Sequence, residues 1–477
     1  MAERLETEAV VRMLDDLGRS DLGDPRRVAR AQRVVERLAA NPGASLPDAL
    51  VTDSELEGAY RLFSNERVTF NHLIDAHAQG TADRARDAGL VLAIHDTTTC
   101  VFRHADPNEV GYLNTGKPGF LLHLTLLVDT REWRRPLGLT HAEVLSRRKR
   151  PVYSGKKARP SSYATARDPN REFLRWQRGI DITGARLEGA DAAVLHVADR
   201  ESDSYELMAT CLAQQMRFIF RARTNRNTVH DGAVAPIRDV IDGREVVLER
   251  EVPLSRRLGA DEPQTRRTHP PRESRVARLY FAKAQATFLR PHVAGRHLPK
   301  TIVVNVVHVF ERDAPKGQPP VDWLLYTTEP VDTKEDVEAV VDYYRCRWLI
   351  EELNKALKSG CIVQDRRLES LDALTTMLAL SLPIAVELLA LRALARSNAS
   401  APAATLYTGP QLAALRHVSH RVLPSEPTVQ DVLWCVAGLG GHIKNNGQPG
   451  WQVLQRGMEK FVAFAAGWCA RDVSSDL

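Results

Sequence analysis

Four side chains that could hold a metal ion and the phosphates around it are spaced along one predicted helix, from Tyr344 to Lys358. With about 100° per residue, Arg347, Glu351 and Lys358 fall within about 60° of Tyr344 on the helix surface. Burying such a mixed polar stripe without partners would be costly, so we expect it to face water or a site that uses it. A carboxylate flanked by cations suits a site that binds a metal and holds phosphate oxygens beside it.

Two further acids, Asp96 and Asp199, stand at the ends of short, branched apolar runs that predict buried strands. Open α/β sheets place their sites just beyond the carboxyl ends of such strands. Together with Glu351 they would supply the oxygen ligands that two divalent cations need for an in-line phosphoryl displacement. Each acid alone also fits an ordinary helix cap, and we assign Asp203 as the cap of the helix after the second strand. Glu352 points about 100° away from Glu351 and ranks below it as a ligand.

The composition is that of a globular protein. The chain has 477 residues, of which 43% are hydrophobic and 26% charged, enough for two to four domains. It has no run of 18 apolar residues and no signal-peptide layout, so we expect a cytoplasmic protein. Its six cysteines are widely scattered without a Cys-x-x-Cys pair, which argues against a zinc module or a disulfide framework.

The net charge of +5 is unevenly distributed. The window from Arg147 to Arg178 contains eleven Lys and Arg residues against Asp168 and Glu172, which leaves the rest of the chain net negative. A concentrated basic window is typical of a protein that binds nucleic acid. The alternative interpretation is a solvated basic loop.

A predicted N-terminal helix carries a second group of basic side chains. Asp24 and Pro25 form a good start signal, and four arginines follow at spacings of 4, 3 and 4. These are Arg26, Arg30, Arg33 and Arg37. Such a face could lie along a DNA backbone. The alternative is a solvated helix face with a local pair such as Arg33 with Glu36.

We predict an α/β fold with four regions. Alternating runs separated by basic, proline-rich loops predict an antiparallel β insertion. The predicted regions are a helical N-terminal domain at 1–75, a catalytic core at 76–223 and 321–372, the β-rich insertion at 224–320, and a helical C-terminal domain at 373–477.

The spacing Tyr-x2-Arg-x3-Glu-x6-Lys resembles the YREK signature of bacterial cut-and-paste transposases of the insertion-sequence-four family, most closely the Tn-five type. The likeness extends over nearly the whole chain in order and spacing. The other similar segments are 93–98, 197–203, 218–221, 323–330, 22–27 and 438–441. One segment departs from the family pattern, because Glu172-Phe-Leu-Arg175-Trp176 lacks the serine that often follows the glutamate.

The resemblance implies a ribonuclease-H-like core with an Asp-Asp-Glu triad formed by Asp96, Asp199 and Glu351, with the β insertion between the last two. It also implies two Mg²⁺ ions per active site, with Mn²⁺ as a substitute. The implied reactions are nicking, hairpin formation, hairpin opening and strand transfer into target DNA. They would take place in a homodimer that brings two transposon ends together through the C-terminal domain.

The resemblance further implies DNA contacts for five residues. Tyr344, Arg347, Lys358 and Arg221 would hold phosphates of the transposon end, and Trp323 would stack on a base flipped out of the hairpin. Such an aromatic platform offsets part of the unstacking cost. Without the resemblance, Trp323 fits a core position and Tyr344 fits helix packing.

Two alternative functions remain open from the sequence. A DNA-binding regulator would occupy the ends without cutting, although the intact acids and helix motif argue against decay. A ribonuclease-H-like nuclease acting on RNA hybrids would have little use for the arginine-faced N-terminal helix or the long C-terminal helical segment.

Overall fold

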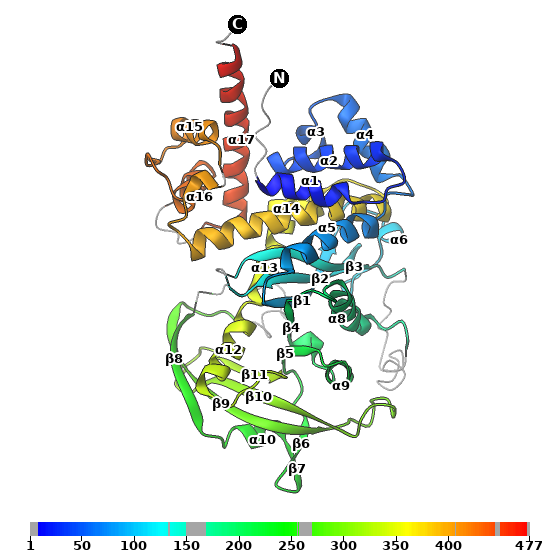
Figure 1. Ribbon diagram of the computed structural model, residues 1–477, viewed down its shortest axis with the longest axis vertical. Helices are drawn as coiled ribbons and strands as arrows, with labels where there is room; N and C mark the ends of the chain where they lie inside the picture. The colour runs from blue at the N-terminus through cyan, green and yellow to red at the C-terminus, as the bar shows by residue number, and fades with distance from the viewer. Residues whose placement is uncertain are drawn as a thin grey trace. The chain divides into compact units, whose positions relative to one another are not determined.

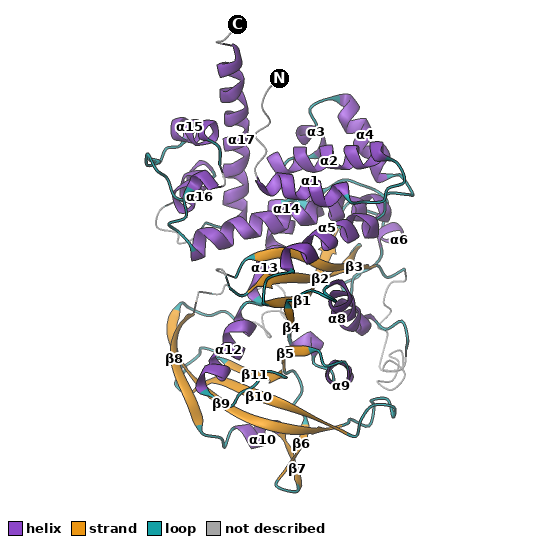
Figure 2. Ribbon diagram, viewed as in Figure 1, coloured by secondary structure: helices purple, strands orange, loops and turns teal. Residues whose placement is uncertain are grey.

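The computed structural model describes residues 8–131, 134–148, 168–254, 256, 270–405, 407–443 and 449–474. The chain forms two compact units (Figure 1). The first contains the described parts of Met1–Ala158, Arg178–Ala193 and Trp348–Leu477, and the second those of Arg159–Gln177 and Val194–Arg347. Helices and strands occur in both units (Figure 2), which confirms the predicted α/β class.

The first unit holds one antiparallel sheet and most of the helices. Its strands are β1 (Leu90–Val101), β2 (Gly119–Asp129) and β3 (Pro136–Leu145). Its helices before the sheet are α1 (Glu8–Gly18), α2 (Pro25–Ala40), α3 (Leu46–Ala49), α4 (Asp53–Phe63) and α5 (Phe70–Ala85). The later ones are α6 (Pro107–Val110), α8 (Arg175–Arg186), whose first turn belongs to the second unit, α13 (Trp348–Lys355), α14 (Leu371–Ser397), α15 (Gly409–Val418), α16 (Val429–Leu439) and α17 (Trp451–Ser474). Single turns form η4 (Ala356–Gly360), η5 (Val363–Asp365) and η6 (Ala403–Thr405).

The sheet of the first unit has the order β3-β2-β1. Figure 1 shows α5 and α14 on one side of it and α8 on the other. Because side chains alternate along a strand, Asp96 and His95 point to opposite faces of β1. The face of His95 lies against α8, where a Cβ added to Gly179 would come within 3.1 Å of the His95 and His123 rings. Any larger residue at that position of α8 would force these buried rings to shift by a few tenths of an ångström.

The N-terminal helices pack as their sequence predicts. The Asp24 side chain caps α2 by accepting a hydrogen bond from the Arg26 amide, and Pro25 occupies the first turn. The apolar face of α2 is buried, while its arginines lie on the other face. The predicted domain boundary at residue 75 falls inside α5.

A buried arginine connects the N-terminal helices to the motif region. The Arg366 guanidinium is 6% exposed and donates hydrogen bonds to backbone oxygens of Pro42 (3.2 Å), Ala44 and Cys361 (3.1 Å). Pro42 and Ala44 belong to the loop after α2, and Cys361 directly follows η4. Burial lowers the pKa of Arg366. One side chain therefore joins three backbone positions of the first unit.

The long helix α14 passes through the core of the first unit. It continues through Pro383 and is not split there. By length and composition its stretch Leu371–Arg396 could cross a membrane, but 78% of the apolar window is buried inside the protein. The helix therefore has the burial of a core helix.

The second unit holds a mixed sheet flanked by helices. Its strands are β4 (Ala193–Ala198), β5 (Arg217–Arg221), β6 (Asn227–His230), β7 (Ala233–Pro236), β8 (Val246–Leu254), β9 (Arg275–Leu289), β10 (Thr301–Glu311) and β11 (Asp322–Thr327). Its helices are η2 (Glu172–Leu174), η3 (Arg200–Ser202), α9 (Tyr205–Ala213), α10 (Ile237–Ile241) and α12 (Lys334–Arg345).

The order of these strands is β4-β5-β11-β10-β9-β6-β7, with β8 also paired to β9. Strands β4 and β5 are parallel and the other pairs are antiparallel. Helix α9 packs on β5, and α12 packs on β8 and β10. A large mixed sheet with flanking helices agrees with the expected ribonuclease-H-like core. The 224–320 insertion is antiparallel as predicted, and it continues the sheet through β10 and β11.

Candidate active site and nucleic-acid interface

The motif region is not the single helix that the sequence predicted. Helix α12 ends at Arg345, and α13 begins only at Trp348. The amides of Cys346 and Arg347 bond to oxygens three residues back, at 3.1 and 3.0 Å, so the turn tightens and the i→i−4 series is interrupted. After α13 the chain widens into the π-helical turn η4, where the Cys361 amide bonds to the Ala356 oxygen at 2.9 Å.

This interruption divides the motif between the two units. Tyr344 and Arg347 belong to the second unit, whereas Glu351 and Lys358 belong to the first. The common stripe of four side chains therefore stays a prediction. Within each unit, the motif residues have well-defined partners.

In the first unit, the motif helix is hydrogen-bonded to β1 at two points. The Asn354 side-chain nitrogen donates to Asp96 Oδ2 at 3.0 Å, and the Lys358 ammonium donates to Thr98 Oγ1 at 2.6 Å. Four helical residues rise about 6 Å and two strand residues about 6.7 Å, so positions i and i+4 of the helix match i and i+2 of the strand. Sequence alone indicated Lys358, but it gave no reason to select Asn354.

Glu351 is carried by the same helix, one turn before Asn354. Residues three apart on a helix have Cβ atoms about 5–6 Å from each other. Since Asn354 contacts Asp96, Glu351 lies about one helical turn from the position that binds Asp96. The two predicted acids of the first unit, Asp96 and Glu351, are thus brought to the same part of the fold.

The donor set at this point fits a hard divalent cation. Asp96 and Glu351 offer carboxylate oxygens, and the side-chain oxygen of Asn354 is buried without a hydrogen-bond partner among the described residues. Carboxylate oxygens such as those of Asp96 and Glu351 are ligands that Mg²⁺ and Mn²⁺ prefer. Within the described ranges, no three His, Cys, Asp or Glu side chains are grouped closely enough to hold a metal by themselves.

Lys358 lies next to these acids in a largely buried position. Burial lowers the pKa of Lys358, although the nearby Cys100 and Asp96 favour its charged form. A partly desolvated ammonium beside a carboxylate is suited to an anionic substrate group. This agrees with the predicted role of Lys358 as a phosphate ligand.

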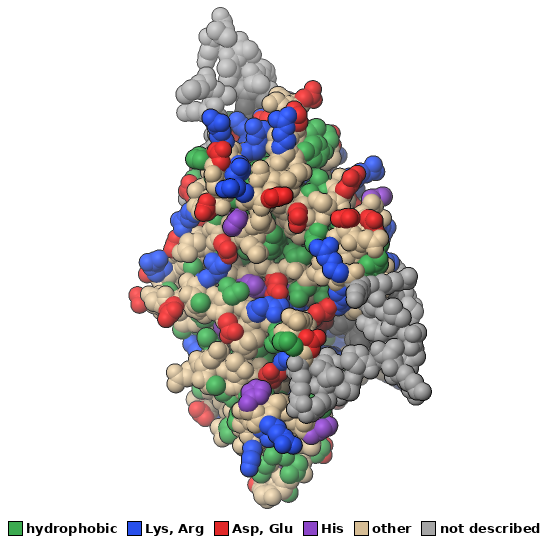
Figure 3. All heavy atoms as spheres, turned by 90° about the vertical axis from the view of Figure 1, so that its right-hand side faces the viewer, with side chains coloured by type: hydrophobic (Ala, Val, Ile, Leu, Met, Phe, Trp, Pro, Cys, Tyr) green, Lys and Arg blue, Asp and Glu red, His purple; other side chains and the backbone are tan. Residues whose placement is uncertain are grey.

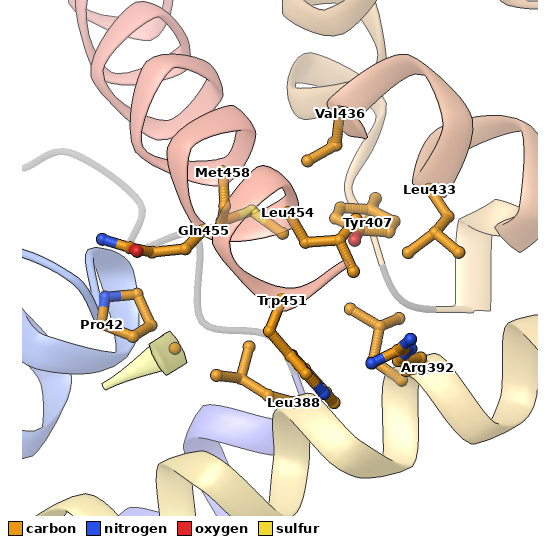
Figure 4. A pocket seen from close by; sticks show the side chains of 12 residues that line it. Pro42, Leu388, Arg392, Tyr407, Leu433, Val436, Trp451, Leu454, Gln455 and Met458 are labelled. Atoms are coloured by element: carbon orange, nitrogen blue, oxygen red, sulfur yellow. The ribbon is translucent and has the colours of Figure 1, made fainter. Parts of the chain in front are cut away.

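Glu352 is held on another side of α13. Its carboxylate accepts hydrogen bonds from Arg392 (2.7 Å), Trp451 (3.2 Å) and Lys355 (2.8 Å). The Arg392 guanidinium lies 4.5 Å from the Trp451 ring centroid, beside an apolar cavity of about 40 Å³ between α14, α16 and α17 (Figure 4). Glu352 therefore anchors the motif helix to the C-terminal helices, consistent with its lower rank as a ligand.

In the second unit, Asp199 follows β4 as predicted. Its Oδ1 atom accepts a hydrogen bond of 2.9 Å from the Glu201 amide and so caps the short turn η3. In the described part of the chain, Oδ2 accepts no hydrogen bond. One oxygen of Asp199 thus acts as the helix cap that was the alternative role for a strand-end acid. Its other oxygen has no hydrogen bond among the described residues.

The assignment of Asp203 as a helix cap is wrong, because Ser204 occupies the cap position of α9. The Asp203 carboxylate is fully buried, accepts hydrogen bonds from the Arg223 and Thr224 amides at 2.7 Å each, and pairs with Arg226. The reason is a tertiary contact: three donors from the loop after β5 bind the Asp203 carboxylate, whereas a helix end would offer it fewer. Asp203 is a structural acid.

Three of the predicted DNA-contacting residues come together in the second unit. The Arg221 guanidinium lies 5.6 Å from the Trp323 ring centroid, and the Tyr344 ring meets the same tryptophan edge-on at 5.6 Å. Trp323 on β11 is partly buried, and Tyr344 on α12 is 3% exposed. A residue on β5, one on β11 and one on α12 thus form a single aromatic and cationic cluster.

The cations near this cluster repel one another. Burial and the positive charges of Arg200 and Arg347 lower the pKa of Arg221, against the favourable effect of Tyr344. No carboxylate among the described residues pairs with Arg221. An anion would relieve both the burial and the repulsion, as a phosphate does in arginine clusters. Arg200, directly after Asp199, belongs to this group and was not predicted from the sequence.

The predicted arginine face of α2 borders a groove of about 370 Å³ between α2 and α4, lined by Arg26, Arg30 and Arg33. Arg26 and Arg30 are exposed. Arg33 pairs with Glu36 at 2.8 Å, as the alternative interpretation suggested, and Arg37 pairs with Glu55 of α4 at 3.0 Å. The first two arginines are therefore more available to a partner than the last two.

The central part of the basic window, residues 149–167, lies outside the described residues. Three arginines at its end form ion pairs: Arg171 with Glu206, Arg175 with Glu201, and Arg178 with Glu143. On the face drawn in Figure 3, basic and acidic side chains are interspersed among the described residues. The three arginines at the end of the window thus have acidic partners within the fold.

Two family models match this chain. Residues 13–68 match a transposase DNA-binding domain, and residues 180–385 match a transposase DDE domain. The first match contains all of α2, and the second contains Asp199 and Glu351, while Asp96 precedes it. The chain is therefore similar to a transposase DNA-binding domain in one region and to a transposase DDE domain in another, and this combination supports DNA transposase function.

Proposed function

We propose that this protein is a metal-dependent transposase of the insertion-sequence-four, Tn-five-like type that excises its element and joins it to target DNA. The observation that carries the proposal is the hydrogen-bonded attachment of the motif helix to β1. Through Asn354 and Asp96, this attachment brings the helix of Glu351 to the first aspartate strand. The two domain models that match this chain both describe transposase domains.

The third ligand in this proposal is Asp199. The Ala193 amide, at the start of β4, donates to the Gly89 oxygen just before β1 at 2.6 Å. Asp199 directly follows β4 and keeps one carboxylate oxygen without a hydrogen bond among the described residues. In the proposal, Asp96, Asp199 and Glu351 hold two Mg²⁺ ions, or Mn²⁺ in their place, which supply Lewis-acid activation of water or a 3′-hydroxyl.

The remaining residues act on the DNA. Lys358, Arg347 and Arg221 hold the phosphates of the transposon end, with Tyr344 beside them, and Arg200 adds to their charge. Trp323 provides the platform for a base flipped from the hairpin, because its ring already accepts a cation on its face. The arginines of α2 bind the terminal repeat, and a homodimer in the cytoplasm pairs two ends.

The test is cleavage of DNA that carries the element's own ends, in Mg²⁺ and in Mn²⁺. We expect Glu351→Gln and Asp96→Asn each to reduce cleavage by about 10³-fold or more, while binding of the same DNA is retained. Near wild-type cleavage by Glu351→Gln would show that the triad assignment is wrong. Binding without cleavage by the wild-type protein in both metals would favour a regulator, and preferential cleavage of RNA–DNA hybrids would favour the nuclease alternative.

A further inference from the structure

We propose that Asn354 is a positioning residue of the active site. Its side-chain nitrogen fixes one oxygen of Asp96, and its side-chain oxygen accepts a hydrogen bond from a water molecule on the metal that Asp96 binds. This inference rests on the proposed function and adds a role to a residue outside the four-residue signature.

The first observation is the fixed geometry of the Asn354 amide. Asn354 is 9% exposed and donates to Asp96 Oδ2 at 3.0 Å. Its helix neighbours Leu353, Ala356 and Leu357 are fully buried, and the bond between Lys358 and Thr98 holds the next turn against the same strand. The amide therefore has little freedom to turn, and it holds Asp96 Oδ2 in one position.

The second observation is the unsatisfied oxygen of the same amide. Asn354 Oδ1 is buried and accepts no hydrogen bond within the described residues. Exchanging the amide oxygen and nitrogen would not help, since it would place an acceptor against the Asp96 carboxylate. A buried acceptor of this kind is costly unless a donor reaches it. The neighbouring carboxylate cannot be that donor when ionised, so the missing partner has to come from outside the described protein groups.

A metal-bound water fits this requirement. A cation on Asp96 orients its waters with their hydrogens pointing outward, toward acceptors around the site. An amide oxygen beside that carboxylate is therefore placed to accept from such a water. Groups that orient metal ligands typically contribute 10- to 100-fold to metal affinity.

The experiment compares Asn354→Leu with the wild-type protein. Leucine has nearly the shape of asparagine but no polar atoms, so it keeps the packing and removes both hydrogen-bonding functions. Binding of Mn²⁺ to the full-length protein is measured by electron paramagnetic resonance, and thermal unfolding is followed with and without Mn²⁺. We expect the Mn²⁺ dissociation constant to rise about 10-fold or more, with an unchanged or higher Tm in the absence of metal.

Two controls make the result decisive. Gln364→Ala removes a 3.3 Å hydrogen bond to the Thr99 oxygen on the same strand, and we expect it to leave Mn²⁺ binding unchanged. Asn354→Ala serves in place of the leucine variant if that variant does not fold. A lower Tm with unchanged Mn²⁺ affinity in the folded variant would overturn the inference, because it would assign Asn354 a purely structural role. If Glu351→Gln also leaves Mn²⁺ binding unchanged, the proposed function itself fails.

Discussion

The two parts of the candidate site differ in how their polar groups are satisfied. In the first unit, Asn354 and Lys358 each donate to a matching acceptor on β1. In the second unit, burial and neighbouring cations act against the charge of Arg221. The first region is held in place by its own hydrogen bonds, whereas the second lacks an anion. Under the proposed function, the acids would be preorganised for metal binding, and the cationic cluster would gain stability from DNA.

The largest expected effect separates the acid of the second unit from its neighbour. We expect Asp199→Asn to reduce cleavage about 10³-fold or more, or about 4 kcal/mol, with little change in Tm. Asp203→Asn should instead destabilise the fold by about 3–5 kcal/mol, because it leaves buried Arg226 without its charged partner. Cleavage assays and thermal unfolding of both variants test this. A stable, inactive Asp203→Asn protein would contradict the assignment.

A similar pair of neighbouring acids tests the first unit. Glu352→Gln should lower the free energy of unfolding by about 2–3 kcal/mol, since Arg392 and Trp451 lose a buried charged acceptor. Glu351→Gln should leave it nearly unchanged. Denaturant unfolding of the two variants measures the difference, and equal losses would remove the distinction between an anchoring and a reacting carboxylate.

The cationic cluster is tested by DNA affinity. We expect Arg221→Ala to weaken binding of the transposon end about 10-fold and to lower the slope of log affinity against log salt by about 1. Mn²⁺ binding should not change, because Arg221 is not one of the proposed metal ligands. Arg312→Ala is the matched control. Arg312 also lies over aromatic rings, but these belong to Tyr280 on β9 and Phe310 on β10. A loss of Mn²⁺ affinity in Arg221→Ala would contradict the division of roles.

The smallest effect concerns the carboxylate next to the tryptophan. Burial raises the pKa of Asp322, but hydrogen bonds from His308 (2.9 Å) and Arg238 (2.7 Å) outweigh it and hold that pKa well below its usual range. The ionised form therefore stabilises the fold above a pH of about 3.9, and this stability is lost as the pH falls through the lowered pKa. After allowance for solvent screening, Asp322→Asn should cost about 1 kcal/mol at pH 7. Unfolding between pH 7 and pH 3 should show the difference shrinking; a constant difference would exclude the ionic contribution.

The sequence predicted the strands and most helices of this fold because their patterns are local. The expected strand-end position of Asp96 was wrong, because β1 continues past it to Val101 through its pairing with β2. The alternating runs of the insertion became antiparallel strands, and the start signal at Asp24 caps α2 as expected. The prediction of a single motif helix was wrong. Its break at Cys346 and the π-helical turn at Ala356 follow from hydrogen bonds that change span by one residue, which a uniform 100° rotation does not contain.

The site was predicted less completely than the fold. Motif spacing identified residues far apart in sequence, and Arg221, Trp323 and Tyr344 lie together. Partners from other elements escaped prediction. Glu55 pairs with the predicted Arg37, and Asn354 contacts the predicted Asp96. No charge pattern or periodicity in the sequence marks Glu55 or Asn354. The placement of Asp199 with the other two acids stays a prediction.

The buried Arg366 has a consequence for engineering. Its guanidinium joins the loop after α2 to the end of the motif helix, so the region that matches a transposase DNA-binding domain and the motif helix are linked by hydrogen bonds from one side chain. A chimera that replaces residues 13–68 with a foreign reader must reproduce the carbonyl positions of Pro42 and Ala44. A foreign domain that lacks these two carbonyl oxygens would leave the buried Arg366 guanidinium without two of its acceptors, so it would destabilise the protein.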